Sequence, residues 1–147
     1  MTTPHRQIQR GFTIIELVVV IVILGIMAVV VLPRMDFLGV FEATGFRDQT
    51  VAILRFAQKT ALAQRRAVCV TVGATGVTLR IDTTTPPDDT CDADLGLPFT
   101  PRDGNGLAGG NFNFLRLGET SQASGEITLT VTGAAPIRID AVTGYVR

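Results

Sequence analysis

Phe12–Leu32 reads FTIIELVVVIVILGIMAVVVL, and this stretch decides how the chain folds. Its 21 residues contain one charged side chain, Glu16, and one other polar side chain, Thr13. At about 1.5 Å of rise per residue, a helix of this length is roughly 31 Å long, close to the roughly 30 Å hydrocarbon core of a bilayer. Because it is apolar on every face, we expect this helix to lie in lipid or inside a bundle of protein helices.

A polar leader, MTTPHRQIQRG, precedes this run and carries Arg6 and Arg10 but no acidic residue. By the positive-inside bias, the leader stays in the cytoplasm and the rest of the chain crosses the membrane. A cleaved secretory signal would have a shorter apolar core, of about 7–15 residues. A plain signal anchor explains the length but leaves Glu16 without a partner, and a charged residue at the bilayer centre costs about 2.5 to 3.5 kcal/mol of insertion free energy. A third interpretation gives Glu16 a partner.

That interpretation rests on residues 10–17, RGFTIIEL, followed by the Val- and Ile-rich run. They resemble the class III signal of type IV prepilins and type II secretion pseudopilins, in which an inner-membrane prepilin peptidase cuts after the glycine and methylates the new terminal amine. The resemblance implies cleavage between Gly11 and Phe12, N-methylation of Phe12, and Glu16 as the fifth mature residue. A glycine suits the cut, because a Cβ would crowd an enclosed protease site.

Cleavage would create an ammonium at Phe12 on the same apolar helix as Glu16. In a filament, the Glu16 carboxylate of one subunit would meet the Phe12 amine of a neighbour, so that two charges that are costly alone compensate each other. The alternative is that Glu16 only reaches the cytoplasmic interface. Cleavage would also leave 11 basic against 13 acidic residues in 136, a formal net charge of −2.

Residues 33–66 are expected to continue as a helix into the periplasm. Pro33 either kinks the helix or marks the end of its membrane part. The pattern then becomes irregular, with Gly39 and Gly45 as breakers, and apolar residues return at helical spacing from about Phe46 to Arg66. The basic pair that ends this segment suits a helix C-terminus.

Residues 67–147 predict a β-rich head, because apolar and polar residues alternate there. Strands are expected at 68–72 and 77–81, joined by the turn GATG, and at 112–117, 126–132, 136–140 and 145–147, with a loop-rich stretch at 83–111. One helix followed only by strands predicts an α+β fold: a long N-terminal helix, half membrane and half amphipathic, packed on a small antiparallel β-sheet head.

This order of elements resembles the GspH/FimT group of minor pilins and pseudopilins, and the phrase FRDQ at 46–49 with the Cys69 strand looks most like the minor pilin of mannose-sensitive haemagglutinin pilus systems. The resemblance implies a single-pass inner-membrane precursor with a periplasmic head, which enters or primes a type IV pilus or a type II secretion pseudopilus. Its implied partners are the prepilin peptidase, other pilin subunits and the inner-membrane assembly platform.

Cys69 and Cys91 are the two cysteines of the chain, and the topology places both in the oxidising periplasm. A disulfide between them would close a loop of about 22 residues and add roughly 3 kcal/mol of stability. The alternatives are two unpaired thiols or a redox site, although no CxxC spacing is present.

Acidic residues gather after the first hairpin, at Asp88, Asp89, Asp92 and Asp94. They are weak candidates for Ca²⁺ ligands, but the bidentate Glu of the EF-hand pattern is missing, so a solvated acidic loop is favoured and no metal or cofactor is expected. The single histidine, His5, lies in the leader, so neither a His-dependent triad nor a His-based zinc site can form in the head, and we do not expect an enzyme.

The C-terminal tail TGYVR is similar to the region where some FimT-like minor pilins carry paired arginines for DNA uptake. Here Tyr145 stands where a second arginine would be wanted, and Arg147 is alone. A DNA-binding minor pilin is therefore the alternative function. The net charge of −2 argues against nucleic acid as a partner, because phosphate binding strengthens with each neutralised contact.

Overall fold

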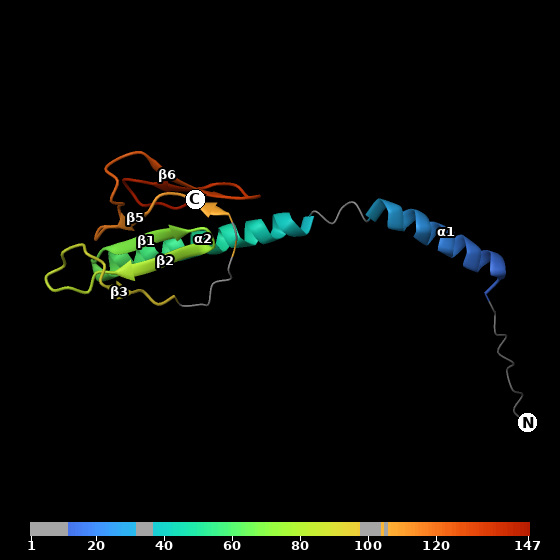
Figure 1. Cartoon of the computed structure of the whole chain (residues 1–147), viewed down its shortest axis with the longest axis horizontal. Coiled ribbons are helices and arrows are strands. Elements are labelled where there is room, and N and C mark those ends of the chain that lie inside the picture. Colours follow the sequence, from blue (N-terminus) through green and yellow to red (C-terminus); the bar gives the residue numbers. More distant parts are fainter. Residues whose placement is uncertain (1–11, 32–36, 98–103, 105) are drawn as a thin grey trace, which may run out of the picture. The chain divides into compact units, whose positions relative to one another are not determined.

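The computed structural model describes residues 12–31, 37–97, 104 and 106–147. Two helices lie within these residues, α1 at Ile14–Val31 and α2 at Phe37–Gln64 (Figure 1). The chain divides into two compact units, Met1–Phe37 and Leu38–Arg147. The leader, with Gly11, and the expected kink at Pro33 lie outside the described residues.

Helix α2 begins earlier than the sequence pattern predicts. The expectation that Gly39 and Gly45 break the helix is wrong, because both lie inside α2. A glycine in a helix interior costs only about 1 kcal/mol relative to alanine, which favourable neighbours can offset. At both positions a Cβ would meet nothing within 4 Å, so packing does not demand glycine there.

Helix α2 ends in a Schellman turn. Arg65 has a left-handed φ of 52°, and the Arg66 N–H donates to the carbonyl of Ala61 at 3.2 Å. Both arginines therefore lie just beyond Gln64, the last helical residue, rather than inside the last turn. The turn redirects the chain into the first strand.

Two antiparallel sheets form the rest of the head, where the sequence predicts one. The first has the order β3-β2-β1-β5 and the second the order β4-β6-β7. Their strands are β1 (Val68–Gly73), β2 (Gly76–Ile81), β3 (Ala93–Asp94), β4 (Leu107–Ala108), β5 (Phe112–Phe114), β6 (Glu126–Val131) and β7 (Ile137–Asp140). The expected last strand is reduced to a single bridge between Val146 and Ile139.

The strand registers follow the predicted alternation. Val68 lies opposite Ile81 on β2 and opposite Phe114 on β5, which places three buried side chains side by side. Strand β5 ends at Phe114, three residues before the expected end. It ends there because residues 115–118 form a turn in which the Gly118 N–H donates to the carbonyl of Leu115 at 2.9 Å.

One hydrophobic core joins α2 to both sheets. Leu54, Ala57 and Ala61 of α2 are fully buried in the same cluster as Phe114 of the first sheet, and Leu129, Ile137 and Ile139 of the second. Figure 1 shows α2 running alongside β1 and β2. The prediction of an α+β fold with a helix packed on an antiparallel sheet is confirmed.

Residues 104 and 106–108 connect the two sheets, and they come from the stretch expected to be loop. The Leu107 N–H donates to the carbonyl of Ala74 at 3.2 Å, and the Thr132 N–H donates to the carbonyl of Gly106 at 3.1 Å. Gly104 lies so close to the Phe46 ring that a Cβ would overlap it. This glycine therefore lets the connection approach the N-terminal part of the core.

Candidate functional site

Helix α1 begins with a capped first turn that contains Glu16. Thr13 precedes the first helical residue, and its hydroxyl accepts a hydrogen bond from the Glu16 N–H at 3.4 Å, as an N-cap side chain does. The spacing T-x-x-E is that of a capping box, with the acid three residues after the cap. The carboxylate of Glu16 therefore lies at the helix end where the macrodipole favours a negative charge.

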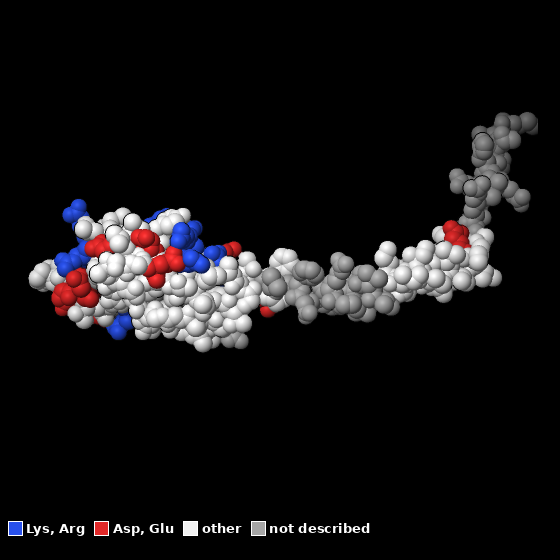
Figure 2. Space-filling view, turned by 90° about the horizontal axis from the view of Figure 1, so that it is seen from above, with Lys and Arg blue, Asp and Glu red and all other residues white. Residues whose placement is uncertain are grey.

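The described surface of α1 is apolar and exposed. Glu16 is the only charged residue between Ile14 and Val31, and Figure 2 shows the rest of this helix as uncharged surface. Its large apolar side chains from Ile14 to Met27 are all exposed, and so is Phe12 before the cap. A helix with no polar face must be covered by lipid or by other helices. No helix within the described residues satisfies both the length and the hydropathy required of a membrane span.

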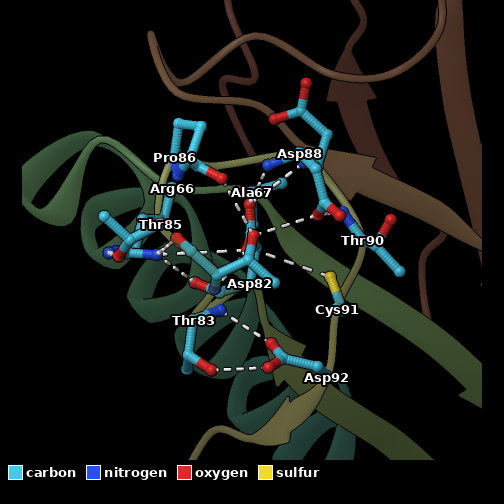
Figure 3. A network of polar contacts seen from close by, with 12 residues as sticks. Arg66, Ala67, Asp82, Thr83, Thr85, Pro86, Asp88, Thr90, Cys91 and Asp92 are labelled. Carbon is cyan, nitrogen blue, oxygen red and sulfur yellow. Dashed lines mark hydrogen bonds and ion pairs between the residues drawn. The ribbon is translucent and has the colours of Figure 1, made fainter.

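In the head, the acidic loop is organised around a residue that the sequence did not single out, Asp82. Its side chain is completely buried at the end of β2 (Figure 3). One carboxylate oxygen accepts from the Thr84 N–H at 2.8 Å and the Thr84 hydroxyl at 2.7 Å, and the other accepts from the N–H groups of Asp88 and Asp89, each at 3.0 Å. The Thr84 hydroxyl is the main reason why the pKa of Asp82 lies below its ordinary value.

Arg66 ties the end of α2 to the same loop. Its guanidinium donates to the carbonyls of Thr84 at 2.7 Å and Asp82 at 3.1 Å, and lies 3.9 Å from the Asp82 carboxylate. The buried negative charge is therefore compensated by one cation and four hydrogen bonds. An Asp two residues before a Thr, directly after a strand, is the Asx-turn signal that could have revealed this residue.

The four acids considered as calcium ligands have protein partners instead. Asp88 accepts from the Thr90 N–H at 2.9 Å, Asp89 forms a bidentate pair with Arg116 at 2.9 and 3.1 Å, and Asp92 accepts from the Thr83 hydroxyl at 2.6 Å. Asp94 lies 3.5 Å from Arg80. Within the described part of the chain, no group of three or more acidic, Cys or His side chains is arranged to hold a metal ion.

The disulfide between Cys69 and Cys91 is present, with the two Cα atoms 6.1 Å apart. It joins the second residue of β1 to Cys91, which lies between Asp89 and Asp92. The segment 82–91 is therefore held at both ends, at Asp82 by hydrogen bonds and at Cys91 by a covalent bond.

The C-terminal arginine is engaged within the head. Arg147 donates to one carboxylate oxygen of Glu126 at 2.5 Å, while Arg138 donates to the other at 3.2 Å. The hydrogen bond from Arg147 is the main reason why the pKa of Glu126 is lowered. The last residues therefore close the second sheet beside β7, as the Val146 bridge also indicates.

One known protein family matches part of this chain. Residues 6–32 match the family model of the prokaryotic N-terminal methylation motif. This is a prepilin-type motif. Comparisons with curated proteins and with solved structures give no match. The prepilin-type motif covers residues 6–11 of the expected leader, the Gly11–Phe12 bond and the apolar run, and it supports a type IV pilin-like protein.

The prepilin-type motif implies processing by a prepilin peptidase, membrane insertion and assembly with other pilins in a pilus or a secretion system. Proteins of this kind are generally structural components rather than enzymes. The motif was therefore recognisable from the sequence, and the roles of Gly11, Phe12 and Glu16 stay predictions. The sequence did not single out two structural features: the Thr13 side chain that caps α1, and the buried Asp82 that organises the acidic loop of the head.

Proposed function

We propose that this chain is a minor pilin or pseudopilin of the GspH/FimT type, and not an enzyme. Its parts are a leader at 1–11 that is removed, an apolar assembly helix at 12–32, a helical continuation at 33–66 and a β-rich head at 67–147. Before assembly, the apolar helix anchors the chain in the inner membrane as a single pass, with the head in the periplasm. After assembly, neighbouring subunits cover the same helix.

One observation carries this proposal: an apolar, exposed helix whose only charge is an acid in a capped first turn, directly after a prepilin-type cleavage sequence. Cleavage at Gly11 places the new amine of Phe12 one residue before the Thr13 cap. The amine and Glu16 then stand near the same end of the helix, where a charge on one subunit can compensate the opposite charge on a neighbour.

Processing is tested by mass spectrometry of the N-terminus after expression of the full chain with the prepilin peptidase of its host. We expect a mature chain that begins with methylated Phe12. Gly11→Val should abolish cleavage. Gly25→Val is the matched control, because a Cβ at Gly25 would meet nothing within 4 Å, and it should be processed normally. A mature chain that still begins at Met1 would overturn the proposal.

Assembly is tested with Glu16→Gln, which removes the charge and keeps the shape of the side chain. We expect normal processing but reduced recovery of the chain in sheared filaments. Glu42→Gln, at an exposed acid of α2, is the control and should enter filaments as the wild type does. Equal incorporation of both variants would contradict the charge-pairing role of Glu16.

A further inference from the structure

Two turns of the head meet at one residue of α2, Gln58. Its side-chain amide donates to the carbonyl of Thr143 at 2.9 Å and lies 3.4 Å from that of Gly118. Two turns that are distant in sequence therefore meet at this helix. They are in direct contact, because a Cβ at Gly144 would overlap the carbonyl oxygen of Gly118.

Each converging segment carries a large apolar side chain that is exposed. These side chains are between 54 % and 78 % exposed, and we call them the Gln58 patch: Leu62, Leu117, Val142 and Tyr145. Among the described residues after α1, Phe41 is the one other large apolar side chain with comparable exposure. Single exposed apolar residues are ordinary, whereas a group of them at one place marks an interaction site.

The helix side of the Gln58 patch is positively charged. Arg55 and Lys59 lie three residues before and one residue after Gln58, on the same side of α2 as Leu62, and Arg65 follows the helix end. The last acidic residue of α2 is Asp48, so this half of the helix carries cations only. Arg55 donates to the neutral carbonyl of Val146, while Lys59 and Arg65 have no hydrogen-bond or ion-pair partner among the described residues.

An open hollow of about 500 Å³ adjoins the Gln58 patch, shares Leu117 with it, and is also lined by Arg65. Its other lining residues are Asp89, Leu115, Arg116 and Glu119. The bidentate pair with Asp89 occupies Arg116. One oxygen of Glu119, Oε2, is buried and has no donor within the described part of the chain.

We propose that the Gln58 patch and this hollow form a docking surface for an acidic segment of another filament subunit. The segment inserts an apolar side chain beside Leu117 and places carboxylates against Lys59 and Arg65. The naming of the partner as a filament subunit rests on the proposed function. The four apolar side chains favour protein over nucleic acid, because a phosphate backbone gains nothing from them.

Site-specific photo-crosslinking in the native host tests this surface. A photoreactive phenylalanine derivative replaces Leu117 in the full chain, and the same derivative at Thr78, an exposed residue of β2 outside the patch, is the control. We expect an adduct from position 117 and none from position 78. Mass spectrometry of the adduct should identify a different chain with a prepilin-type motif, joined at an apolar residue that has acidic neighbours.

Charge variants sharpen the test. Lys59→Glu should reduce the adduct about fivefold, because a favourable rim contact becomes repulsive, whereas Lys59→Arg should retain it. The absence of an adduct would overturn the proposal, and so would an adduct only with a second copy of this chain, with lipid or with nucleic acid. A crosslinked partner segment without acidic residues, or an adduct whose yield is unchanged by Lys59→Glu, would overturn it as well. The N-terminal mass of each variant reports processing separately, so failure of docking is distinguishable from failure of the proposed function.

Discussion

Asp82 and Thr84 form two hydrogen bonds to each other across a single intervening residue, through the N–H and the hydroxyl of Thr84, at 2.8 and 2.7 Å. These bonds turn the chain directly after β2 and bury a carboxylate beneath the acidic loop. The loop in turn presents Asp89 to Arg116, a residue that lines the hollow beside the Gln58 patch. The turn at Asp82 and Thr84 therefore helps to shape the hollow around Arg116, which lies far from this turn in the sequence.

Asp82→Asn should destabilise the head. An amide cannot accept hydrogen bonds from donors on both sides, so at least one buried N–H group loses its partner. We expect the melting temperature of the full chain in detergent, followed by circular dichroism, to fall by about 5 °C or more. Asp94→Asn is the control, because Asp94 is 93 % exposed and should change the melting temperature by about 1 °C or less.

The head should lose stability in acid. The folded state lowers the pKa of four carboxyl groups, chiefly through hydrogen bonds from Thr84, Thr83, Arg147 and the Thr143 N–H, and these groups are Asp82, Asp92, Glu126 and Asp140. A lowered folded pKa stabilises the folded state above the unfolded pKa, at about pH 4, and this contribution disappears as the pH falls through the folded pKa. The melting temperature should be flat between pH 6 and 7 and drop below about pH 4. A melting temperature that rises in acid would contradict this assignment.

Removal of the disulfide should cost about 3 kcal/mol, because the bond closes a 22-residue separation that would otherwise be free in the unfolded chain. The double variant Cys69→Ser with Cys91→Ser, compared with the wild type under oxidising conditions, should show this loss in chemical denaturation. Reduction of the wild type with dithiothreitol is the control and should bring it to a similar midpoint. Identical midpoints for the oxidised wild type and the double variant would refute the estimate.

Gly144→Ala should destabilise the head more than Gly125→Ala. Both glycines have positive φ, at 66° and 97°, so both variants carry backbone strain. Only at Gly144 would the new methyl group overlap a backbone atom, the carbonyl oxygen of Gly118, whereas nothing lies within 4 Å at Gly125. The difference between their melting temperatures isolates the contact between the two turns. If the two variants melt together, that contact is absent in solution.

Leu54→Ala and Leu62→Ala compare two leucines of the same helix. Leu54 is fully buried in the shared core, and its truncation should cost about 2 to 5 kcal/mol of unfolding free energy. Leu62 is exposed in the Gln58 patch, so its truncation should cost about 0.5 kcal/mol or less. A large loss at Leu62 would mean that it packs within its own head, and would weaken its assignment to a docking surface.

The elements with strong local signals were predictable. Uninterrupted apolar residues identified α1, helical spacing identified most of α2, and alternation identified β1, β2, β6 and β7 to within a residue or two. The start of α2 was missed because the two glycines lower helix propensity only slightly, and propensity is a weak guide where neighbours favour the helix. Strands β3 and β4 have two residues each, too few for an alternating pattern, so the second sheet was not separated from the first.

The amino-acid sequence by itself determined the prepilin-type motif and the apolar helix, because both lie within one short segment, and it predicts cleavage after Gly11 and a role for Glu16. Tertiary structure alone decided how distant residues of the head come together. Asp82 becomes a hub only when its loop folds back over it, and Gln58 unites two turns that lie 60 and 85 residues further along the chain. Contacts over such separations depend on how the strands pack against the helix, and no local pattern of residues encodes that packing.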